Sequence, residues 1–124
     1  MNLVDSSAWL EFFKNSLNAR HFSAIIENTE ELIVSPINYF EIYKKVLQDF
    51  GPDDAKRAIG FLNQGKNIEI SNSIALEASE LAISHHLHMA DSLLLATANS
   101  VDAIFWTMDA HFKDIPGVKY FEKE

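Results

Sequence analysis

Two carboxylates follow segments with the character of buried strands. Asp5 comes directly after Asn2–Val4, a short apolar run near the beginning of the sequence, and Asp109 follows Ala103–Trp106 after a Thr-x spacer. Short apolar runs that stop at polar residues predict buried strands. Because ligands of parallel sheets bind beyond the carboxyl ends of the strands, we expect both acids at the same edge of a sheet.

Two further acids are predicted to join them from helices. A Ser-Pro pair predicts a helix that begins at Pro36, and Glu41 falls in its second turn, on a stripe with Ile37 and Lys45. Asp91 begins the most apolar helical segment, which is typical of a helix buried on several sides. The four acids are therefore expected near one edge of the sheet.

A cluster of four carboxylates raises the pKa of each member unless a cation neutralises it. Mg²⁺ and Mn²⁺ prefer carboxylate oxygen and water and need neither Cys nor His. Mg²⁺ usually retains several waters, and a water activated by a metal ion can attack a phosphodiester. The pattern therefore favours metal-assisted phosphodiester hydrolysis.

Each acid also has an ordinary structural interpretation. Asp5 could serve only as a helix N-cap, and Asp91 only as a favourable charge at a helix N-terminus. Glu41 is harder to explain in this way, because an acid beside a core-facing stripe loses hydration unless it is paired. Lys45 could supply that pairing.

The remaining pattern alternates strands with helices along all 124 residues. Such alternation predicts one α/β domain over residues 1–124, a parallel sheet with helices on both faces. Further strands are expected at Glu31–Val34, Ile68–Ile70 and Val118–Phe121. Further helices are expected after Asp5, at Ala19–Asn28, from Pro36 to the Gly51-Pro52 pair, and at Asp53–Asn63, Ser73–His86 and Asp91–Val101.

Composition excludes several other classes of protein. The chain has no Cys, which rules out disulfide scaffolds, thiolate metal sites and Cys nucleophiles. Its net charge of −8 argues against a protein that binds nucleic acid mainly through overall positive charge. The first residues carry no basic segment and no apolar run reaches about 20 residues, so we expect a soluble cytoplasmic protein without a signal peptide.

Four motifs occur in order along the sequence. They are Asp-Ser-Ser after the opening strand, Ser-Pro-x-x-x-x-Glu, Ala-Asp-Ser-Leu-Leu-Leu-Ala-Thr-Ala and Trp-Thr-x-Asp-x-x-Phe. Together they resemble the PIN-domain ribonucleases, particularly the VapC-like toxins of prokaryotic toxin–antitoxin pairs. The resemblance runs from Leu3 to about Phe121. It implies an endoribonuclease that depends on Mg²⁺ or Mn²⁺, pairs with an antitoxin protein and forms a homodimer.

The same resemblance assigns roles to individual residues. The metal-binding and catalytic acids of the family correspond to Asp5, Glu41, Asp91 and Asp109. Thr107 matches the hydroxyl of the Thr-x-Asp motif, and Ser7 matches the polar residue that supports the first acid. Asp91 is followed by Ser-Leu-Leu where family members more often have Ala-x-Ile, which leaves the acid in place.

Three other groups of residues are candidates for contacts. His85, His86 and His88 lack the four-residue spacing of a helical metal site and are expected at helix ends, whereas His111 is expected at the surface. The basic residues best placed to meet an RNA backbone are Lys14, Arg20, Lys44 and Lys45. An antitoxin groove is expected from the aromatic residues Trp9, Phe12, Phe13 and Phe22, for which core packing is the alternative.

Two functions of other classes remain open at this point. The first is a non-catalytic interaction domain of PIN-like architecture that binds a protein through its aromatic groove. The second is a phospho-receiver domain, which the sequence disfavours because Asp5 is followed by Ser6-Ser7 rather than by part of an acidic pair.

Overall fold

The computed structural model describes residues 1–124 and is built around a parallel sheet. The five strands lie in the order β3-β2-β1-β4-β5, and every neighbouring pair is parallel. Their bounds are β1 Asn2–Val4, β2 Leu32–Val34, β3 Lys66–Asn67, β4 Ile104–Thr107 and β5 Val118–Tyr120. The predicted α/β class with a central parallel sheet is confirmed.

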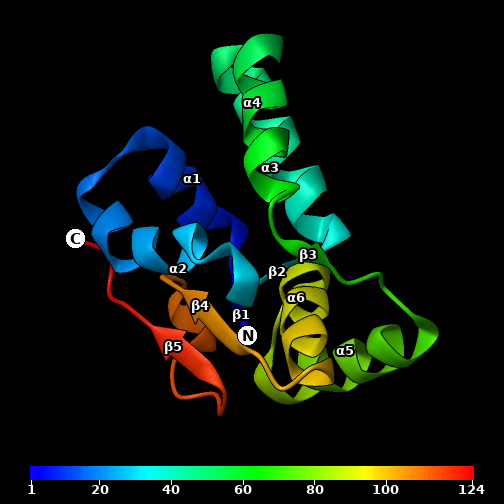
Figure 1. Ribbon diagram of the computed structural model, residues 1–124. Helices are drawn as coiled ribbons and strands as arrows, with labels where there is room; N and C mark the ends of the chain where they lie inside the picture. Colours follow the sequence, from blue (N-terminus) through cyan, green and yellow to red (C-terminus); the bar gives the residue numbers. More distant parts are fainter.

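Six α-helices surround the sheet (Figure 1). Their bounds are α1 Ser6–Lys14, α2 Ser23–Glu27, α3 Pro36–Phe50, α4 Pro52–Leu62, α5 Asn72–His85 and α6 Met89–Ser100. Short 3₁₀ turns occur at η1 Leu17–His21, η2 Thr29–Glu31 and η3 Ala110–Phe112. Helices α3 and α4 lie side by side and project from the sheet (Figure 1). None of the helices has the length and apolar character that a membrane crossing requires.

Successive residues of the central strands belong to cores on opposite faces of the sheet. Val4 and Val34 pack in a core with residues of α1, α2, α3 and α4. Leu3 and Ile33 join a second core, which α6 and the segment after β4 complete with Leu95 and Phe112 among others. Because both faces are covered, the central strands are apolar without alternation, which is why they are recognisable in the sequence.

The strand order creates a crevice at the carboxyl ends of β1 and β4. Strands β2 and β3 lie on one side of β1, while β4 and β5 lie on the other. The chain leaves β1 into α1 on one face and leaves β4 toward Phe112 in the core of the opposite face. Ligands of open α/β sheets bind at such a divergence. The order also differs from the 2-1-3-4-5 order of receiver-type sheets, which removes the phospho-receiver alternative.

The Ser-Pro helix start and the Gly-Pro helix stop are both confirmed. The Ser35 hydroxyl accepts a hydrogen bond from the backbone N–H of Ile37 at 3.1 Å, and Pro36 is the first residue of α3. Gly51 ends the helix with φ +91°, a backbone conformation that residues with a Cβ rarely adopt. The next residue, Pro52, begins α4, so one glycine makes the sharp turn of the projecting hairpin.

Two predicted elements differ from the structure. The expected helix Ala19–Asn28 is split into η1 and α2 at Phe22, where φ is −120° and the ring is fully buried. The expected strand Ile68–Ile70 is wrong: β3 is Lys66–Asn67, because these residues pair with the end of β2. Ile68 and Ile70 instead pack against the small core of α5 and α6, so their apolar character reflects helix packing.

Substitution of two glycines tests the hairpin turn. We expect Gly51→Ala to lower the free energy of unfolding by about 1–2 kcal/mol, because alanine is strained at positive φ. The control is Gly60→Ala in the exposed interior of α4, where a Cβ meets no atom within 4 Å. It should raise stability by about 0.5–1 kcal/mol, since alanine is the better helix former. Urea denaturation measures the free energy of unfolding of both variants. Equal changes in the two variants would contradict the assigned turn at Gly51.

Candidate active site

Asp5 is held at the end of β1 by contacts with β4. Its backbone N–H donates to the carbonyl oxygen of Trp106 at 2.9 Å, and its carboxylate accepts a hydrogen bond of 2.8 Å from the Thr107 hydroxyl. The Ser7 hydroxyl lies farther from the same oxygen, at 3.4 Å. Asp5 occupies the N-cap position of α1, but its side chain makes no capping hydrogen bond. Capping therefore does not explain this buried acid.

Thr107 also connects Asp5 with Asp109. The Thr107 hydroxyl accepts a hydrogen bond of 2.9 Å from the backbone N–H of Asp109 while it donates to Asp5. The Asp109 carboxylate accepts from the backbone N–H of His111 at 2.9 Å and lies 2.7 Å from the His111 Nδ1. His111 is exposed, as predicted, and its imidazole contacts one of the four acids.

Asn38 ties α3 to the end of β1 and was not identified from the sequence. Its fully buried amide donates to the carbonyl oxygen of Val4 at 3.2 Å and to the Ser6 hydroxyl at 3.0 Å. Its amide oxygen accepts from the backbone N–H of Ser35 at 3.0 Å. Because Glu41 lies one turn later on α3, these bonds fix its helix relative to Asp5. The only sequence signal was an Asn in the first turn after Ser-Pro.

The predicted alternative for Glu41 is not found. Lys45 forms its ion pair with Asp49, one turn farther along α3, at 3.2 Å. No Lys or Arg forms an ion pair with Glu41, Asp5 or Asp91. Asp5, Glu41 and Asp91 therefore have no lysine or arginine partner in this chain.

Asp91 enters the site from the first turn of α6. Burial raises the pKa of Asp91, as do the negative charges of Asp109 and Glu41, while His88 and His111 lower it. His88 is the N-cap residue of α6, and His85 and His86 end α5, so the prediction of helix-end histidines is confirmed. A favourable charge at a helix N-terminus lowers the pKa of an acid, so that role alone does not explain Asp91.

The four acids share one cleft of about 400 Å³, together with Ser7, Phe40, Lys44 and Lys45. Burial raises the pKa of Asp5 to about 7, and the hydrogen bond from Thr107 only partly opposes this effect. The nearby carboxylates of Asp91, Glu41 and Asp109 raise it further. The sequence prediction that these four acids lie together agrees with their arrangement, which favours a bound proton or a bound cation.

A protein-family model for the PIN domain matches residues 3–118, nearly the whole chain. The chain belongs to the PIN domain family. The resemblance stated from the ordered motifs is therefore confirmed at the level of the family and its fold. No curated relative matches the chain by sequence.

Solved structures with the same PIN-domain fold include chains from several toxin–antitoxin systems. A toxin–antitoxin complex from Klebsiella pneumoniae aligns with a TM-score of 0.84 at 23% identity, covering 99% of this chain and 100% of that chain. VapBC2 from Rickettsia felis, bound to a DNA fragment from its promoter, gives 0.75 at 16%, covering 98% and 97%. Mycobacterium tuberculosis VapC20, a sarcin-ricin loop cleaving toxin, gives 0.75 at 15%, covering 90% and 92%.

The carboxylates of this cleft suit a hard cation that keeps several of its waters, rather than a metal ion fully enclosed by side chains. No three of the acids and histidines converge in an arrangement that would enclose a metal ion. Mg²⁺ is commonly held through one or two carboxylates and keeps several of its waters. A buried carboxylate with a raised pKa, surrounded by other acids and without a basic partner, fits that mode of binding.

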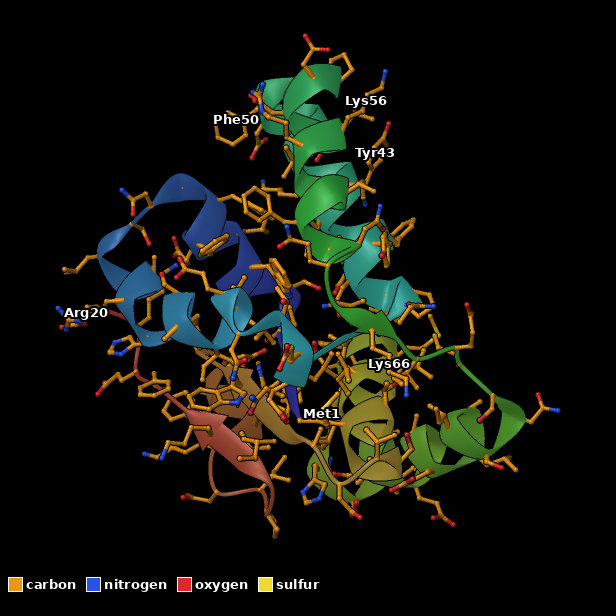
Figure 2. All side chains as sticks on the ribbon, viewed as in Figure 1. Met1, Arg20, Tyr43, Phe50, Lys56 and Lys66 are labelled. Carbon is orange, nitrogen blue, oxygen red and sulfur yellow. The ribbon has the colours of Figure 1, made fainter.

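The four basic residues predicted to contact RNA do not lie together in the structure. Lys44 and Lys45 line the acidic cleft, and Lys14 lines a separate groove that Lys45 also reaches. Arg20 instead pairs with Glu124, and Figure 2 shows it at the left edge of the molecule, away from the projecting hairpin. Of the four basic residues, only Lys44 and Lys45 therefore line the acidic cleft.

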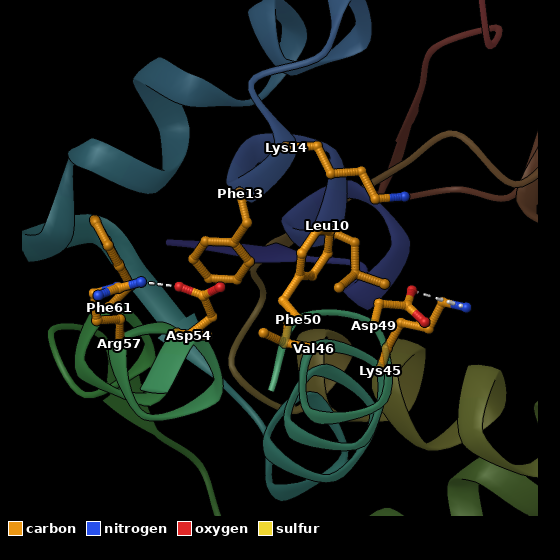
Figure 3. A pocket seen from close by; sticks show the side chains of 11 residues that line it. Leu10, Phe13, Lys14, Lys45, Val46, Asp49, Phe50, Asp54, Arg57 and Phe61 are labelled. Atoms are coloured by element: carbon orange, nitrogen blue, oxygen red, sulfur yellow. Dashed lines mark hydrogen bonds and ion pairs between the residues drawn. The ribbon is translucent and has the colours of Figure 1, made fainter. Parts of the chain in front are cut away.

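The predicted aromatic groove needs a similar correction. Trp9 and Phe22 are fully buried in the core and are not available to a partner, so packing explains both. A groove of about 470 Å³ does lie between α1 and the α3–α4 hairpin (Figure 3). Phe13 lines it, whereas Phe12 packs beside it against Phe61, with ring centroids 5.7 Å apart. The other apolar lining residues are Leu10, Val46, Phe50, Ala58 and Phe61.

The raised pKa of Asp5 predicts a pH-dependent cost in stability. Between about pH 4 and 7 the native protein holds a proton on Asp5 that the unfolded chain releases, so the free energy of unfolding falls as pH rises. Asp5→Asn removes this effect. In EDTA we expect the variant to exceed the wild type by a few kcal/mol at pH 8, with the difference shrinking toward pH 4.

Thermal and urea unfolding at several pH values measure this difference. The control is Asp102→Asn, which replaces an exposed acid at a turn outside the cleft. Its difference from the wild type should not grow with pH in the same way. A wild type as stable as Asp5→Asn at pH 8 would contradict the assigned environment of Asp5.

Loss of Asn38 should destabilise the protein. Asn38→Ala leaves the Ser35 N–H, the Val4 carbonyl and the Ser6 hydroxyl without their buried partner, which we expect to cost about 2–4 kcal/mol in the free energy of unfolding. The matched control is Asn63→Ala, which removes one exposed hydrogen bond from the Tyr39 hydroxyl and should cost less than about 1 kcal/mol. Similar losses in both variants would show that Asn38 does not hold α3 to β1.

Proposed function

We propose that this protein is a Mg²⁺- or Mn²⁺-dependent endoribonuclease and the toxin of a toxin–antitoxin pair, acting in the cytoplasm as one PIN domain over residues 1–124. The observation that carries the proposal is the cleft of four carboxylates, whose buried member Asp5 has a pKa raised to about 7 and no basic partner. Membership of the PIN family, and a fold shared with toxins that include a sarcin-ricin loop cleaving toxin, support it.

The residues of the cleft have distinct parts in this proposal. Asp5, Glu41, Asp91 and Asp109 would hold the divalent cation in this cleft, some of them directly and the others through its bound waters. When bound, the cation supplies Lewis-acid chemistry for hydrolysis of the phosphodiester. Thr107 orients Asp5 and restrains the loop that carries Asp109, so that both carboxylates are positioned before the substrate arrives.

Local charge lets an acidic protein approach RNA. Lys44 and Lys45 stand on the rim of the acidic cleft, where their ammonium groups can contact the phosphate backbone on either side of the cleaved bond. At long range the net charge of −8 repels RNA. We therefore assign substrate binding to these nearby lysines and to the cation.

We place the antitoxin in the groove between α1 and the α3–α4 hairpin (Figure 3). Its apolar floor, which includes Leu10 and Val46, suits an apolar segment of a partner protein. The groove has charged edges, with ion pairs between Lys45 and Asp49 and between Arg57 and Asp54. The related folds crystallised as toxin–antitoxin complexes support a protein partner, and the homodimer stays a prediction of the resemblance.

Cleavage of RNA tests the catalytic proposal. With Mg²⁺ or Mn²⁺ the wild type should cut single-stranded RNA, leaving 3′-hydroxyl and 5′-phosphate ends, and EDTA should abolish the activity. Asp5→Asn and Asp91→Asn should each lower the rate by about 100-fold or more, because each removes a carboxylate that would hold the cation on which hydrolysis depends. Gel analysis of labelled RNA measures the rates.

The matched control is Asp102→Asn, an exposed acid outside the cleft, which should retain the wild-type rate. Calorimetry with Mn²⁺ provides a second readout, with binding to the wild type and weaker binding to Asp5→Asn. Equal cleavage by all variants would reject the proposed site. Absence of both cleavage and metal binding would favour the alternative of a non-catalytic interaction domain.

A further inference from the structure

Phe40 is an exposed aromatic side chain at the edge of the acidic cleft. It precedes Glu41 on α3, and 66% of its surface is accessible to solvent. Phe40 lines the cleft that holds the four acids and also a neighbouring shallow apolar depression with Tyr39 and Tyr43. Its ring makes no stacking or edge contact with any other aromatic ring, in contrast to Phe12 and Phe13. Packing within this chain therefore does not account for it.

Lys44 accompanies Phe40 one helical turn later. Its Nζ lies 5.8 Å from the centroid of the Phe40 ring, within the range of a cation–π contact, and it lines the same cleft. An aromatic surface next to a cation, beside a site for phosphodiester chemistry, matches the two parts of a nucleotide. The base can stack on the ring while the phosphate meets the ammonium group.

We propose that Phe40 is a stacking platform for an unpaired nucleobase adjacent to the phosphodiester bond that is cut, with Lys44 contacting the neighbouring phosphate. This inference rests on the proposed ribonuclease function. A base inside a duplex already stacks on its neighbours, so the platform selects single-stranded or looped RNA. Because every base offers a flat aromatic face, stacking of this kind gives preference for unpaired structure with little preference for sequence.

A nucleic-acid occupant explains the charge beside Phe40 better than a second copy of this chain. The rim of the cleft carries Lys44 and Lys45, which complement phosphate, whereas a second copy would bring the same acidic cleft and the same lysines. Tyr43 and Leu47 extend the apolar surface along α3 away from the acids. Figure 2 shows Tyr43 on the projecting hairpin, on the side opposite to Phe50. Tyr43 lies outside the acidic cleft and therefore provides a matched aromatic control.

Binding is measured first, without cleavage. The protein carries Asp5→Asn, and the probe is a short single-stranded RNA with one 2-aminopurine, whose fluorescence falls on stacking. We expect Phe40→Ala to weaken binding by about 5- to 100-fold and to remove the quenching. Phe40→Tyr should retain both, and Phe40→Leu should lose the quenching, because leucine keeps apolar volume but has no ring. Tyr43→Ala should match the parent protein.

Cleavage then locates the stacked base. Once the cut bond is mapped, an abasic nucleotide is placed on each side of it in turn. For the proteins with Asp5 intact, Phe40→Ala should raise KM more than it lowers kcat on normal RNA. On the RNA that lacks the stacked base, the wild type and Phe40→Ala should become equal.

The outcomes separate this inference from the function on which it rests. Normal binding and quenching by Phe40→Ala, in a wild type that cuts RNA, would overturn the stacking platform alone. If Phe40→Ala and Tyr43→Ala weaken RNA binding equally and light scattering shows a change of oligomeric state, the stacking platform would be overturned in favour of an interface between copies of this chain. A wild type that cuts no RNA with either metal would instead reject the ribonuclease, while the 2-aminopurine measurement would still decide the role of Phe40.

Discussion

The pairing of β1 with β4 at the centre of the sheet is the contact on which the candidate active site depends. It places Val4 opposite Trp106, so that the residues after the two strands emerge side by side. The Thr107 hydroxyl then accepts from the Asp109 backbone and donates to the Asp5 carboxylate. A single side chain thus couples two acids that are far apart in the sequence, and the buried Asn38 adds the helix that carries Glu41.

This arrangement concentrates negative charge where it is costly. Asp5 is only 5% exposed and accepts few hydrogen bonds, so its ionised form is poorly stabilised. Buried carboxylates that repel one another lower the stability of the folded protein. Such unfavourable clusters are common at functional sites. The rest of the fold tolerates the cost because the sheet has separate apolar cores on its two faces.

The net charge of −8 takes on a different meaning in this structure. Four of the acids belong to one cleft, and Lys44 and Lys45 line the same cleft, so positive charge lies directly beside the acidic cluster. The exposed Phe40 adds an aromatic surface to the same rim. The acidic cluster, two lysines and an exposed aromatic ring therefore lie within one small region, as the proposed ribonuclease function requires.

Local patterns in the sequence were enough to predict the fold class and to place four acids at one edge of the sheet. Central strands buried on both faces must be continuously apolar, and Ser35-Pro36 and Gly51-Pro52 impose helix boundaries through local backbone geometry. Which side chains are accessible became clear only from the packing of the folded chain. Trp9 and Phe22 are core residues, Arg20 pairs with the distant Glu124, and Asn38 holds α3 to β1. These features depend on contacts between segments far apart in the chain, which spacing along the sequence does not encode.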